Sequence, residues 1–541
     1  MTSAVSRSPM SPPCVEAGVQ AAADSQCVAS DRRSILVLTV LGSSMAFMDG
    51  SVVNVALPTL QASFRATSSH ILWVVQAYSL LGSALLLFCG ALGDRFGRTR
   101  MYLLGVAVFA LASIGCAASL NLTELILARA IQGFGAALLI PQALAILSDT
   151  YPEGERAGAI GAWSAWTSVS IALGPIVGGW LIQVSSWRAI FLLNIPLTVW
   201  IMWLAPKLRR ATVARSAAAP APLDYRGAAL NILGFAAIVF ALSFVPQLGW
   251  KNPRIGLSLF AGLVLLTVFV LSQRSSKNPL VPLSLFRSSA FSGANVLTFL
   301  AYGALGGAFY IVPYFLIGAR HLLPSSAGAA FLPMIAIMFA FSGRVGTIAA
   351  KVGEVKFMVA GSALTAGGFA LLGLVSKETR YSYGFLPGVL VLGVGITLTV
   401  APLTSFLMSS VAASRRGVAS AVNNSVSRLG GLISVSIVAV AVSHTFNHEF
   451  GRQMQSSGLP VEMQRILVHS KGLMLAIPIP QQFGSSPALR AEELVERSFV
   501  TAYRHVMFGC AFTTLVGTLV ILTTLRKSKI ALGVAEIECR L

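Results

Sequence analysis

The stretch Gly90-Ala91-Leu92-Gly93-Asp94-Arg95-Phe96-Gly97-Arg98-Thr99-Arg100 lies between two long apolar runs, at 72–92 and 101–119. A helix that crosses a bilayer needs about 20 mostly apolar residues, so neither run can accommodate these charges. The charged residues must therefore lie in a very short loop at the membrane surface. Glycines in the loop allow a tight turn and a close approach of the two helices. This stretch predicts an all-α membrane protein.

The amino-acid composition also indicates a membrane protein. The 541-residue chain is 55% hydrophobic and 11% charged, with a mean hydropathy of +0.77, whereas soluble domains are about 25% charged. A net charge of +20 would suggest a nucleic-acid partner in a soluble protein. Here the basic residues lie mostly in short gaps between apolar runs, as in cytoplasmic loops, so we expect no nucleic-acid partner.

Sequence motifs of enzymes and cofactor sites are absent. The chain has no G-x-x-x-x-G-K-[ST] loop for ATP, no nucleophile elbow and no His/Glu metal motif. Its six cysteines lack the spacing of metal or disulfide sites. We therefore expect a protein that is not an enzyme and has no catalytic residues, cofactor or metal site.

Apolar runs predict fourteen transmembrane helices arranged as 6 + 2 + 6. The first six are expected near 35–58, 72–92, 101–119, 124–147, 158–183 and 189–206. Two more follow at 229–246 and 255–272, and the last six at 290–317, 325–348, 357–375, 382–408, 417–445 and 501–525. The expected segments are a disordered cytoplasmic tail (1–33), an N-terminal six-helix bundle (34–206), a two-helix insertion with basic linkers (207–289), a C-terminal six-helix bundle (290–525) with a long external loop (447–500), and a cytoplasmic tail (526–541).

The distribution of lysine and arginine predicts the orientation of the chain. Most of these residues fall in segments that share a side with the N-terminus, and few fall in the short loops on the other side. Because positive loops stay in the cytoplasm, both termini should be cytoplasmic. We expect a multi-pass protein of the cytoplasmic (inner) membrane, with the lipid bilayer as its first partner.

A second glycine-framed loop indicates that the two six-helix bundles are repeats. Gly346-Thr347-Ile348-Ala349-Ala350-Lys351-Val352-Gly353 repeats the frame of Gly90 to Gly97 and keeps one basic residue. Ala350 replaces the acid, so any ion-pair latch made by Asp94 should be missing or differently built in the second half. Parallel repeats of this kind build transporter folds.

An acid interrupts the first apolar run, in Met48-Asp49-Gly50-Ser51-Val52-Val53-Asn54-Val55-Ala56-Leu57-Pro58. A carboxylate in the bilayer interior is costly, so such residues usually face a cavity or a partner, and many belong to proton relays. Asp49 is therefore a candidate proton acceptor. The alternative is an acid near the helix end that is solvated through the mouth of a cavity.

A lone arginine lies in the fourth apolar run, in Arg129-Ala130-Ile131-Gln132-Gly133-Phe134-Gly135-Ala136-Ala137. Arginine at the centre of a span costs about 2.5–3.5 kcal/mol on insertion scales, so it needs a partner. The small residues that follow favour close helix contact. The alternative is an arginine whose side chain reaches the outer membrane interface.

The fifth run contains Gly174-Pro175-Ile176-Val177-Gly178-Gly179. Proline removes one helix hydrogen bond, and the glycines favour a kink and a tight helix interface. Glycine and proline are common in membrane helices, so the physical argument alone predicts only a kinked, closely packed helix.

These motifs together resemble the major facilitator superfamily. The Gly90–Arg100 stretch resembles the signature between its helices 2 and 3, and the Arg129 segment is similar to its fourth-helix motif. The Asp49 segment and Trp187-Arg188-Ala189-Ile190-Phe191-Leu192-Leu193-Asn194-Ile195-Pro196 resemble the drug:proton antiporter-2 branch, which has 14 spans. The fifth-run motif resembles the antiporter signature of exporters, which uptake members generally lack.

The resemblance implies a major facilitator fold and a proton-coupled antiporter that exports lipophilic neutral or monocationic compounds. Asp49 and Arg129 would carry proton coupling. The antiporter motif would comprise Gly174, Pro175, Gly178 and Gly179. The loop residues would control the conformational switch, namely Gly90, Asp94, Arg95, Gly97 and Arg98. In that role Asp94 docks on the N-terminus of the helix that begins near Gly417, where the helix dipole favours an anion.

Aromatic, methionine and polar residues near the interface of the two bundles are candidates for a substrate cavity, because such side chains suit bulky apolar or cationic aromatic ligands. They are Trp73, Gln76, Gln132, Phe309, Tyr310, Tyr314, Met334, Asn423 and Arg428. The alternative is that several of the aromatic residues only face lipid or pack between helices. With Asp49 as the acid deep in the spans, divalent cations should be poor substrates.

Two other functions are compatible with the sequence. One is export of a single endogenous metabolite or lipid, and the other is an uptake permease of the same fold. The sequence also leaves open whether the protein has a further partner, a periplasmic adaptor protein that carries the exported compound beyond an outer membrane.

Overall fold

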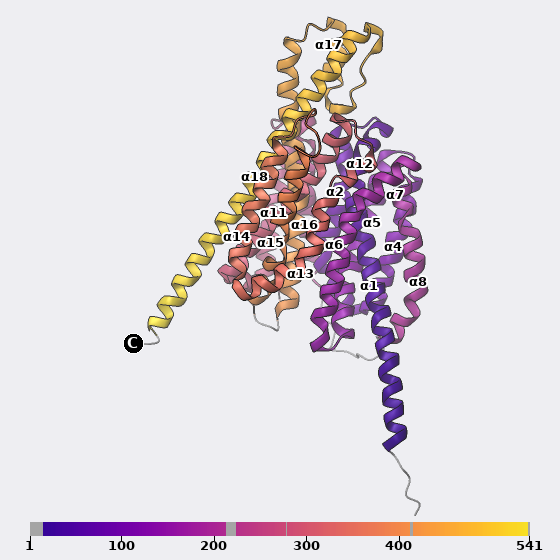
Figure 1. The fold of residues 1–541 in the computed structure, drawn as a ribbon, viewed down its shortest axis with the longest axis vertical. Helices are drawn as coiled ribbons and strands as arrows, with labels where there is room; N and C mark the ends of the chain where they lie inside the picture. Colours follow the sequence, from indigo (N-terminus) through magenta and orange to yellow (C-terminus); the bar gives the residue numbers. More distant parts are fainter. Residues whose placement is uncertain (1–13, 212–222, 277–278, 412–414, 539–541) are drawn as a thin grey trace, which may run out of the picture.

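Long apolar runs form helices because a chain in a bilayer must satisfy its backbone polar groups within its own segment. The computed structural model describes residues 14–211, 223–276, 279–411 and 415–538, and all its long elements are helices (Figure 1). No strand occurs among these residues. The predicted all-α class is therefore confirmed.

The helices follow the order first half, insertion, second half. The first half comprises α1 (Cys14–Phe64), α2 (Ser68–Ala84), α3 (Leu86–Phe96), α4 (Arg98–Ala118), α5 (Leu122–Thr150), α6 (Glu153–Val184), α7 (Ala189–Leu192) and α8 (Asn194–Ala211). The insertion comprises α9 (Tyr225–Leu248) and α10 (Pro253–Ser275). The second half comprises the 3-10 turn η1 (Leu283–Arg287), α11 (Ser289–Pro313), the π-helical turn η2 (Tyr314–Ala319), α12 (Pro324–Ala329), α13 (Leu332–Val352), α14 (Glu354–Gly373), α15 (Phe385–Ser409), α16 (Arg416–Gln455), α17 (Val461–His469), the 3-10 turns η4 (Lys471–Ala476) and η5 (Gln481–Phe483), and α18 (Ser485–Glu538).

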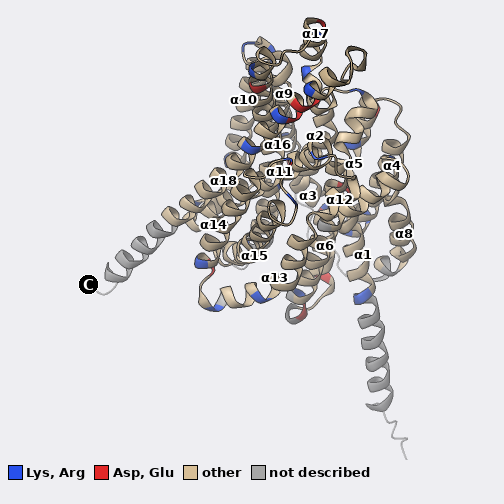
Figure 2. Cartoon of the chain, turned by 45° about the horizontal axis from the view of Figure 1, so that its top comes forward, with Lys and Arg blue, Asp and Glu red and all other residues tan. Residues whose placement is uncertain are grey.

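Thirteen of the described helices are long and apolar enough to cross a membrane. The pair α2 and α3, bent by 49°, passes the same test together, which gives fourteen spans when the pair counts as one. Each predicted apolar run overlaps one of these helices or the bent pair. Figure 2 shows most charged positions towards the two ends of the bundle, with long uncharged stretches of helix between them.

The two glycine-framed loops adopt similar backbone shapes in the two halves. Gly97 joins α3 to α4 with a φ of 97°, and Gly353 joins α13 to α14 with a φ of 115°. Glycine adopts such angles without the strain that other residues would suffer. The shared turn supports the internal repeat that the sequence indicated.

The hydrophobic core is shared by the two halves at one end of the bundle, which we call the α17 end. There, residues of α1, α2 and α7 pack with residues of α11, η2 and α16 in one cluster (Figure 1). Towards the opposite end, from which both chain termini extend and which we call the terminal end, each half has its own cluster. The halves are thus closed against each other at the α17 end and packed separately at the terminal end.

The inserted helices lie beside the seam between the halves. Helix α9 packs against α2 of the first half and α16 of the second, and Asn231 on α9 donates a hydrogen bond to the carbonyl of Ala84, 2.8 Å away. Helix α10 packs on α9 and leaves most of its surface exposed. A helix that is apolar and exposed on this scale is suited to face lipid.

Both ends of the chain are more helical than the sequence indicated. Residues 14–33, expected in a disordered tail, continue α1, and residues 1–13 lie outside the described residues. An alanine-rich segment can extend an existing helix cheaply because no new helix nucleus is needed. For the same reason α18 continues through the expected tail to Glu538. In the basic linkers, residues 212–222 and 277–278 lie outside the described residues.

The long segment 447–500 is not an open loop. It contains the end of α16, all of α17, the turns η4 and η5, and the start of α18. In Figure 1 it projects from the bundle as a helical extension at the α17 end. Polar residues on the continuing helices allow them to leave the apolar region without unwinding.

Candidate functional site

The acid of α1 and the arginine of α5 form an ion pair inside the first half. Arg129 Nη1 donates a hydrogen bond to Asp49 Oδ2. The Arg129 side chain is 1% exposed, and the Asp49 side chain is fully buried. Each side chain neutralises the charge of the other, and either charge without its partner would be costly inside a membrane.

Neutral polar side chains complete the surroundings of Asp49. Its Oδ1 accepts hydrogen bonds from Gln132 Nε2 at 2.9 Å and from Asn194 Nδ2 at 3.0 Å. Gln132 also accepts one from Arg129 Nη1 at 2.6 Å and donates one to Ser113 Oγ at 2.8 Å. The network joins α1, α4, α5 and α8. Gln132, which the sequence assigned to the substrate cavity, is fully buried within it.

This arrangement corrects the physical basis for expecting a monocationic substrate. That expectation relied on Asp49 as the charge that faces the cation. Both carboxylate oxygens of Asp49 accept hydrogen bonds from protein groups, and one of the donors is itself a cation. In this conformation Asp49 is not available to a second cation.

Tyr78 brings α2 into the same network. The guanidinium carbon of Arg129 lies 4.2 Å from the centroid of the Tyr78 ring, and Arg129 Nε donates to the carbonyl of Val74 at 3.1 Å. The Tyr78 hydroxyl donates to the carbonyl of Ala46 on α1 at 2.7 Å. Five helices therefore meet around one ion pair. A proton on Asp49 would cancel the charge that holds Arg129 and so alter contacts on all five.

Sequence reasoning missed three members of this network, namely Ser113, Asn194 and Tyr78. Asn194 carried a usable signal, because it is a lone amide in the apolar stretch that ends at Pro196. Ser113 and Tyr78 carried little signal, because serine and tyrosine occur often in membrane helices without a polar partner.

The charged loop between α3 and α4 forms a cluster within the first half at the terminal end. Arg98 donates to Asp94 Oδ1 from Nε at 3.0 Å and Nη2 at 2.8 Å, and to Asp149 Oδ2 from Nη1 at 2.5 Å. Asp149 was not among the residues predicted from the sequence. Arg95 is exposed and lies over the ring of Phe96. The docking of Asp94 on α16 stays a prediction.

The predicted antiporter motif lies where α6 of the first half crosses α12 of the second, at the α17 end. A Cβ atom on Gly179 would collide with the backbone carbonyl of Pro324. In the reciprocal contact, a Cβ atom on Gly328 would collide with the carbonyl of Pro175. The two glycines therefore let the halves approach to backbone contact.

The other two glycines of the motif press α6 against α1. A Cβ atom on Gly178 would lie 2.5 Å from Val52 Cγ2, and one on Gly174 would collide with Ser51 Oγ. Helix α6 thus contacts its own half through one face and the other half through the adjacent face.

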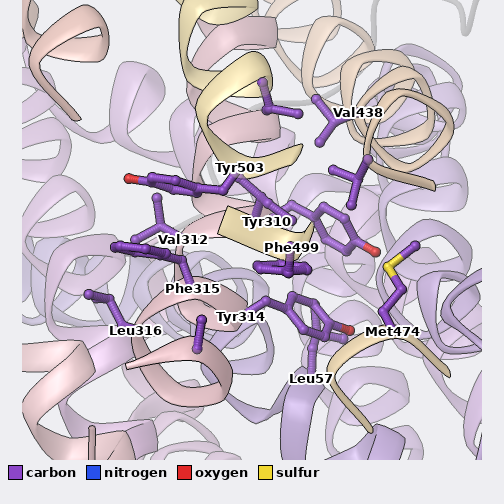
Figure 3. Packing of buried hydrophobic residues seen from close by; sticks show 14 of the residues in the cluster. Leu57, Tyr310, Val312, Tyr314, Phe315, Leu316, Val438, Met474, Phe499 and Tyr503 are labelled. Carbon is purple, nitrogen blue, oxygen red and sulfur yellow. The ribbon is translucent and has the colours of Figure 1, made fainter. Parts of the chain in front are cut away.

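A small apolar cavity lies between the halves at the α17 end. Tyr310 and Tyr314 line it with their ring centroids 5.7 Å apart, and Phe499 and Met474 complete part of its wall. Figure 3 shows Phe499 between the two tyrosine rings and both tyrosine hydroxyl groups on the side of Met474. Tyr310 and Tyr314 were predicted cavity residues, whereas Met474, from the expected loop, was not.

The turn that carries Met474 is hydrogen-bonded to the first half. Gln61 Nε2 on α1 donates to the carbonyl of Leu473 at 3.0 Å, and Ser68 Oγ on α2 donates to the carbonyl of Gly472 at 3.3 Å. Because η4 belongs to the second half, these bonds help to keep the α17 end closed.

Two further cavity candidates lie in helix interfaces. Gln76 is fully buried and donates to the carbonyl of Leu432 at 3.1 Å and to Ser436 Oγ at 2.8 Å, across the seam between α2 and α16. The Trp73 ring lies 6.5 Å from that of Phe240 on α9. In this conformation both side chains pack between helices, as the alternative interpretation expected for aromatic residues such as Trp73, and their place in a substrate cavity stays a prediction.

The remaining predicted residues lie at different places along the seam. Phe309 packs edge-on against Phe331 with ring centroids 5.3 Å apart, and Met334 is buried in the shared core. Asn423 Nδ2 donates to Thr298 Oγ1 at 2.8 Å within the second half. The guanidinium carbon of Arg428 lies 5.0 Å from the ring centroid of Phe47, across the seam. Gly90 packs on α5 near Pro141.

One cluster of metal-type ligands does form, from residues too far apart in sequence to be recognised as a motif. Ligand atoms of His321, Glu492 and Glu496 lie within 4.8 Å of one another at the α17 end. Glu496 also accepts a hydrogen bond from Lys377 Nζ at 2.9 Å, which raises the pKa of that lysine. The lysine supplies the positive charge that a metal ion would otherwise bring.

These features define a multi-pass membrane transporter built from two related helix bundles. The chain belongs to the Major Facilitator Superfamily, whose family model matches residues 39–435. The predicted superfamily is therefore confirmed.

Proteins with a similar sequence or fold support the assignment of the chain to this family. The chain is 33% identical over 404 residues to the multidrug resistance protein Stp of Mycobacterium tuberculosis, covering 74% of each protein. It is 29% identical over 482 residues to the tetracenomycin C resistance and export protein of Streptomyces glaucescens, covering 88% of each. A bacterial homologue of the human lysosomal transporter Spinster, solved in an inward-facing and occupied conformation, shares the fold, with a TM-score of 0.60 at 15% identity over 92% of this chain and 97% of that one.

The ion pair makes a prediction about stability. Arg129→Met leaves the Asp49 carboxylate buried without its cation, so we expect the free energy of unfolding to fall by about 3–5 kcal/mol. The double variant Asp49→Asn/Arg129→Met should lose less, because no charge is left unpaired. Denaturant unfolding of the purified proteins measures both changes. An equal loss in the single and double variants would contradict the pairing.

The crossing of α6 and α12 makes a second prediction. Gly179→Val forces a side chain into the Pro324 backbone and should destabilise the closed α17 end by about 1–3 kcal/mol. Ser69 lines the cavity at that end. When Gly179→Val is combined with Ser69→Cys, a thiol reagent should therefore label the introduced thiol faster than in Ser69→Cys alone. Gly161→Val on the same helix is the matched control, since a Cβ atom there meets nothing within 4 Å. Equal labelling in both variants would refute the role of Gly179.

Proposed function

We propose that this protein is a proton-coupled antiporter that exports lipophilic compounds across the cytoplasmic membrane, with both termini in the cytoplasm. The observation that carries the proposal is the fully buried Asp49–Arg129 pair, which joins five helices of the first half. A buried carboxylate whose bonds hold several helices is suited to convert the gain or loss of a proton into movement.

The proton cycle follows from the bonds of Asp49. In the ionised state Asp49 holds Arg129, Gln132 and Asn194. A proton arriving at Asp49 cancels the ion pair, so Arg129 must find other acceptors and the helices that carry the network can shift. Release of the proton on the other side restores the pair. One proton moving down a membrane potential contributes about 2.3 kcal/mol per 100 mV.

Two observations support export. Relatives of the chain are named for multidrug resistance and for tetracenomycin C resistance and export. The motif that resembles the exporter signature forms the contact between the halves at the α17 end. With the termini in the cytoplasm, the α17 end faces outwards, and the conformation described here is closed to the outside and ready to receive a compound from the inside.

The substrate class follows from the aromatic residues along the seam, which suit lipophilic compounds. Neutral lipophiles need no charge from the protein and fit this proposal directly. A single antibiotic-like compound is the second candidate, because the tetracenomycin C protein is named for one compound. Efflux from expressing cells over a panel of lipophilic compounds, with and without a proton gradient, tests the function and separates the two candidates.

Asp49 should be required for coupling. Asp49→Asn keeps the shape and can still hydrogen-bond, but it cannot take up a proton, so gradient-driven efflux of a lipophilic dye should be abolished while the protein stays in the membrane. A protonophore should raise dye accumulation in cells with the unaltered protein and have no effect on the variant. Glu462→Gln, at an exposed acid on α17, is the control. Unaltered efflux by Asp49→Asn would refute the proposal.

The charged loop should govern the rate of switching and not the choice of substrate. Asp94→Ala removes one partner of Arg98 at the exposed loop of the terminal end, so we expect transport of two unrelated dyes to slow by a similar factor. Asp149→Ala, which removes the other partner, should give the same profile. A change confined to one dye would contradict this role.

A further inference from the structure

Arg428 on α16 is an intramembrane cation for which no described residue supplies a carboxylate or a hydrogen bond. About 18 Å of helix separates it from Arg416, where α16 begins, so it lies deep within the span. Its side chain is partly buried, and its contact across the seam is the ring of Phe47, 5.0 Å from the guanidinium carbon. Arginine in such a place is expensive and usually marks a functional site.

The face of α16 that carries Arg428 is open. Asn424 and Gly431 lie four residues before and three residues after it, so all three share one helix face. Asn424 is exposed, and a Cβ atom built on Gly431 would meet no atom within 4 Å. The face of α16 that carries Arg428 therefore has open space one turn further on, at Gly431, and an exposed polar side chain one turn before, at Asn424.

The opposite wall comes from the first half and is aromatic. Phe47 packs edge-on against Trp163 of α6, with ring centroids 6.3 Å apart, and the Trp163 indole donates to Ser43 Oγ at 3.0 Å. Tyr78 of α2 lies against Arg129, with its ring centroid 4.2 Å from the guanidinium carbon. Asp49 already neutralises Arg129. The charge of Arg428 is not neutralised by a described residue, so this aromatic space has a net positive charge.

We propose that this space is a subsite for an aromatic organic anion, whose carboxylate, phenolate or sulfonate group pairs with Arg428. The inference rests on the proposed export function and names the charge class of its substrates. A guanidinium offers paired N–H donors that match the two oxygens of such a group. The aromatic part of the ligand would lie against Phe47 and Trp163. This replaces the monocation expected from the sequence.

The subsite has an electrical consequence. An anion that leaves the cell while a proton enters moves one more elementary charge per cycle than a neutral analogue does. With the inside of the membrane negative, the potential drives both the proton and the anion in the required directions. Charge movement therefore distinguishes export of the ionised compound from leakage of its neutral form.

Three dansyl compounds test the subsite in proteoliposomes. They are dansyl sulfonate, the neutral dansyl amide, and a dansyl amide that carries a quaternary ammonium group. The sulfonate stays ionised across the usable pH range, so its neutral form cannot diffuse. Transport and equilibrium binding by dansyl fluorescence are measured for the unaltered protein, Arg428→Gln and Arg428→Lys. Arg344→Gln is the matched control, because it removes an exposed arginine from α13 of the same half.

We expect the unaltered protein to bind the sulfonate more tightly than the amide and the quaternary ammonium compound least. Arg428→Gln should raise the KM and Kd for the sulfonate about tenfold or more, the loss typical of one charge-assisted interaction. It should leave the values for the amide unchanged, which also shows that the variant is folded. Arg428→Lys should give an intermediate value, and Arg344→Gln should change none of them.

Equal changes for the sulfonate and the amide, no change for either, or failure of the sulfonate to bind the unaltered protein would each overturn the subsite. If binding follows the expected pattern but transport does not depend on the proton gradient, the proposed coupling fails and the subsite stands. If the amide is exported with proton coupling while the sulfonate is not bound, the function stands and the subsite fails.

Discussion

The ion pair between Asp49 and Arg129 is the constraint on which the first half depends. Two opposite charges without access to water are tolerated only when each is held by the other and by enough neutral dipoles. Gln132, Asn194 and Ser113 provide these dipoles from three helices. Because every partner must stay in place, the helices around the pair can move together or not at all while the pair is ionised. A rigid half is what alternating access between two halves requires.

The second half shares a glycine turn with the first half but not its charges. Gly353 reproduces the turn made by Gly97, yet Ala350 stands where the first half has Asp94. Within its described spans, the deep cation Arg428 has no acid beside it, whereas Arg129 has Asp49. A repeated fold has thus acquired two chemistries. One half satisfies its arginine internally and can respond to a proton, and the other presents an arginine to whatever lies in the seam.

Much of the fold could be predicted because apolar length alone decides where a chain crosses a bilayer. Asp49 and Arg129 could be recognised one at a time, because each charge is costly enough to need a reason. Their pairing could not, since it depends on how α1 and α5 are rotated in the bundle. Ser113 and Asp149 were not predicted, because a serine in a span and an acid at a helix end cost little free energy in a membrane protein. Neither residue type therefore requires a partner. The helical extension between α16 and α18 was not predicted, because its residues are polar enough to suit an open loop.

The two ends of the bundle are held by different forces, and this difference bears on how the protein changes shape. At the α17 end the halves meet through glycine backbones, tyrosine and methionine side chains, and neutral hydrogen bonds such as Gln61 to Leu473. At the terminal end Arg98 is bound by Asp94 and Asp149 of the same half. Close packing is short-ranged and is lost after a small separation. Opening the α17 end therefore gives up its contacts early in the movement. The Arg98 cluster keeps its bonds within one half, so it moves with that half as a unit and loses none of these bonds while the α17 end opens and closes.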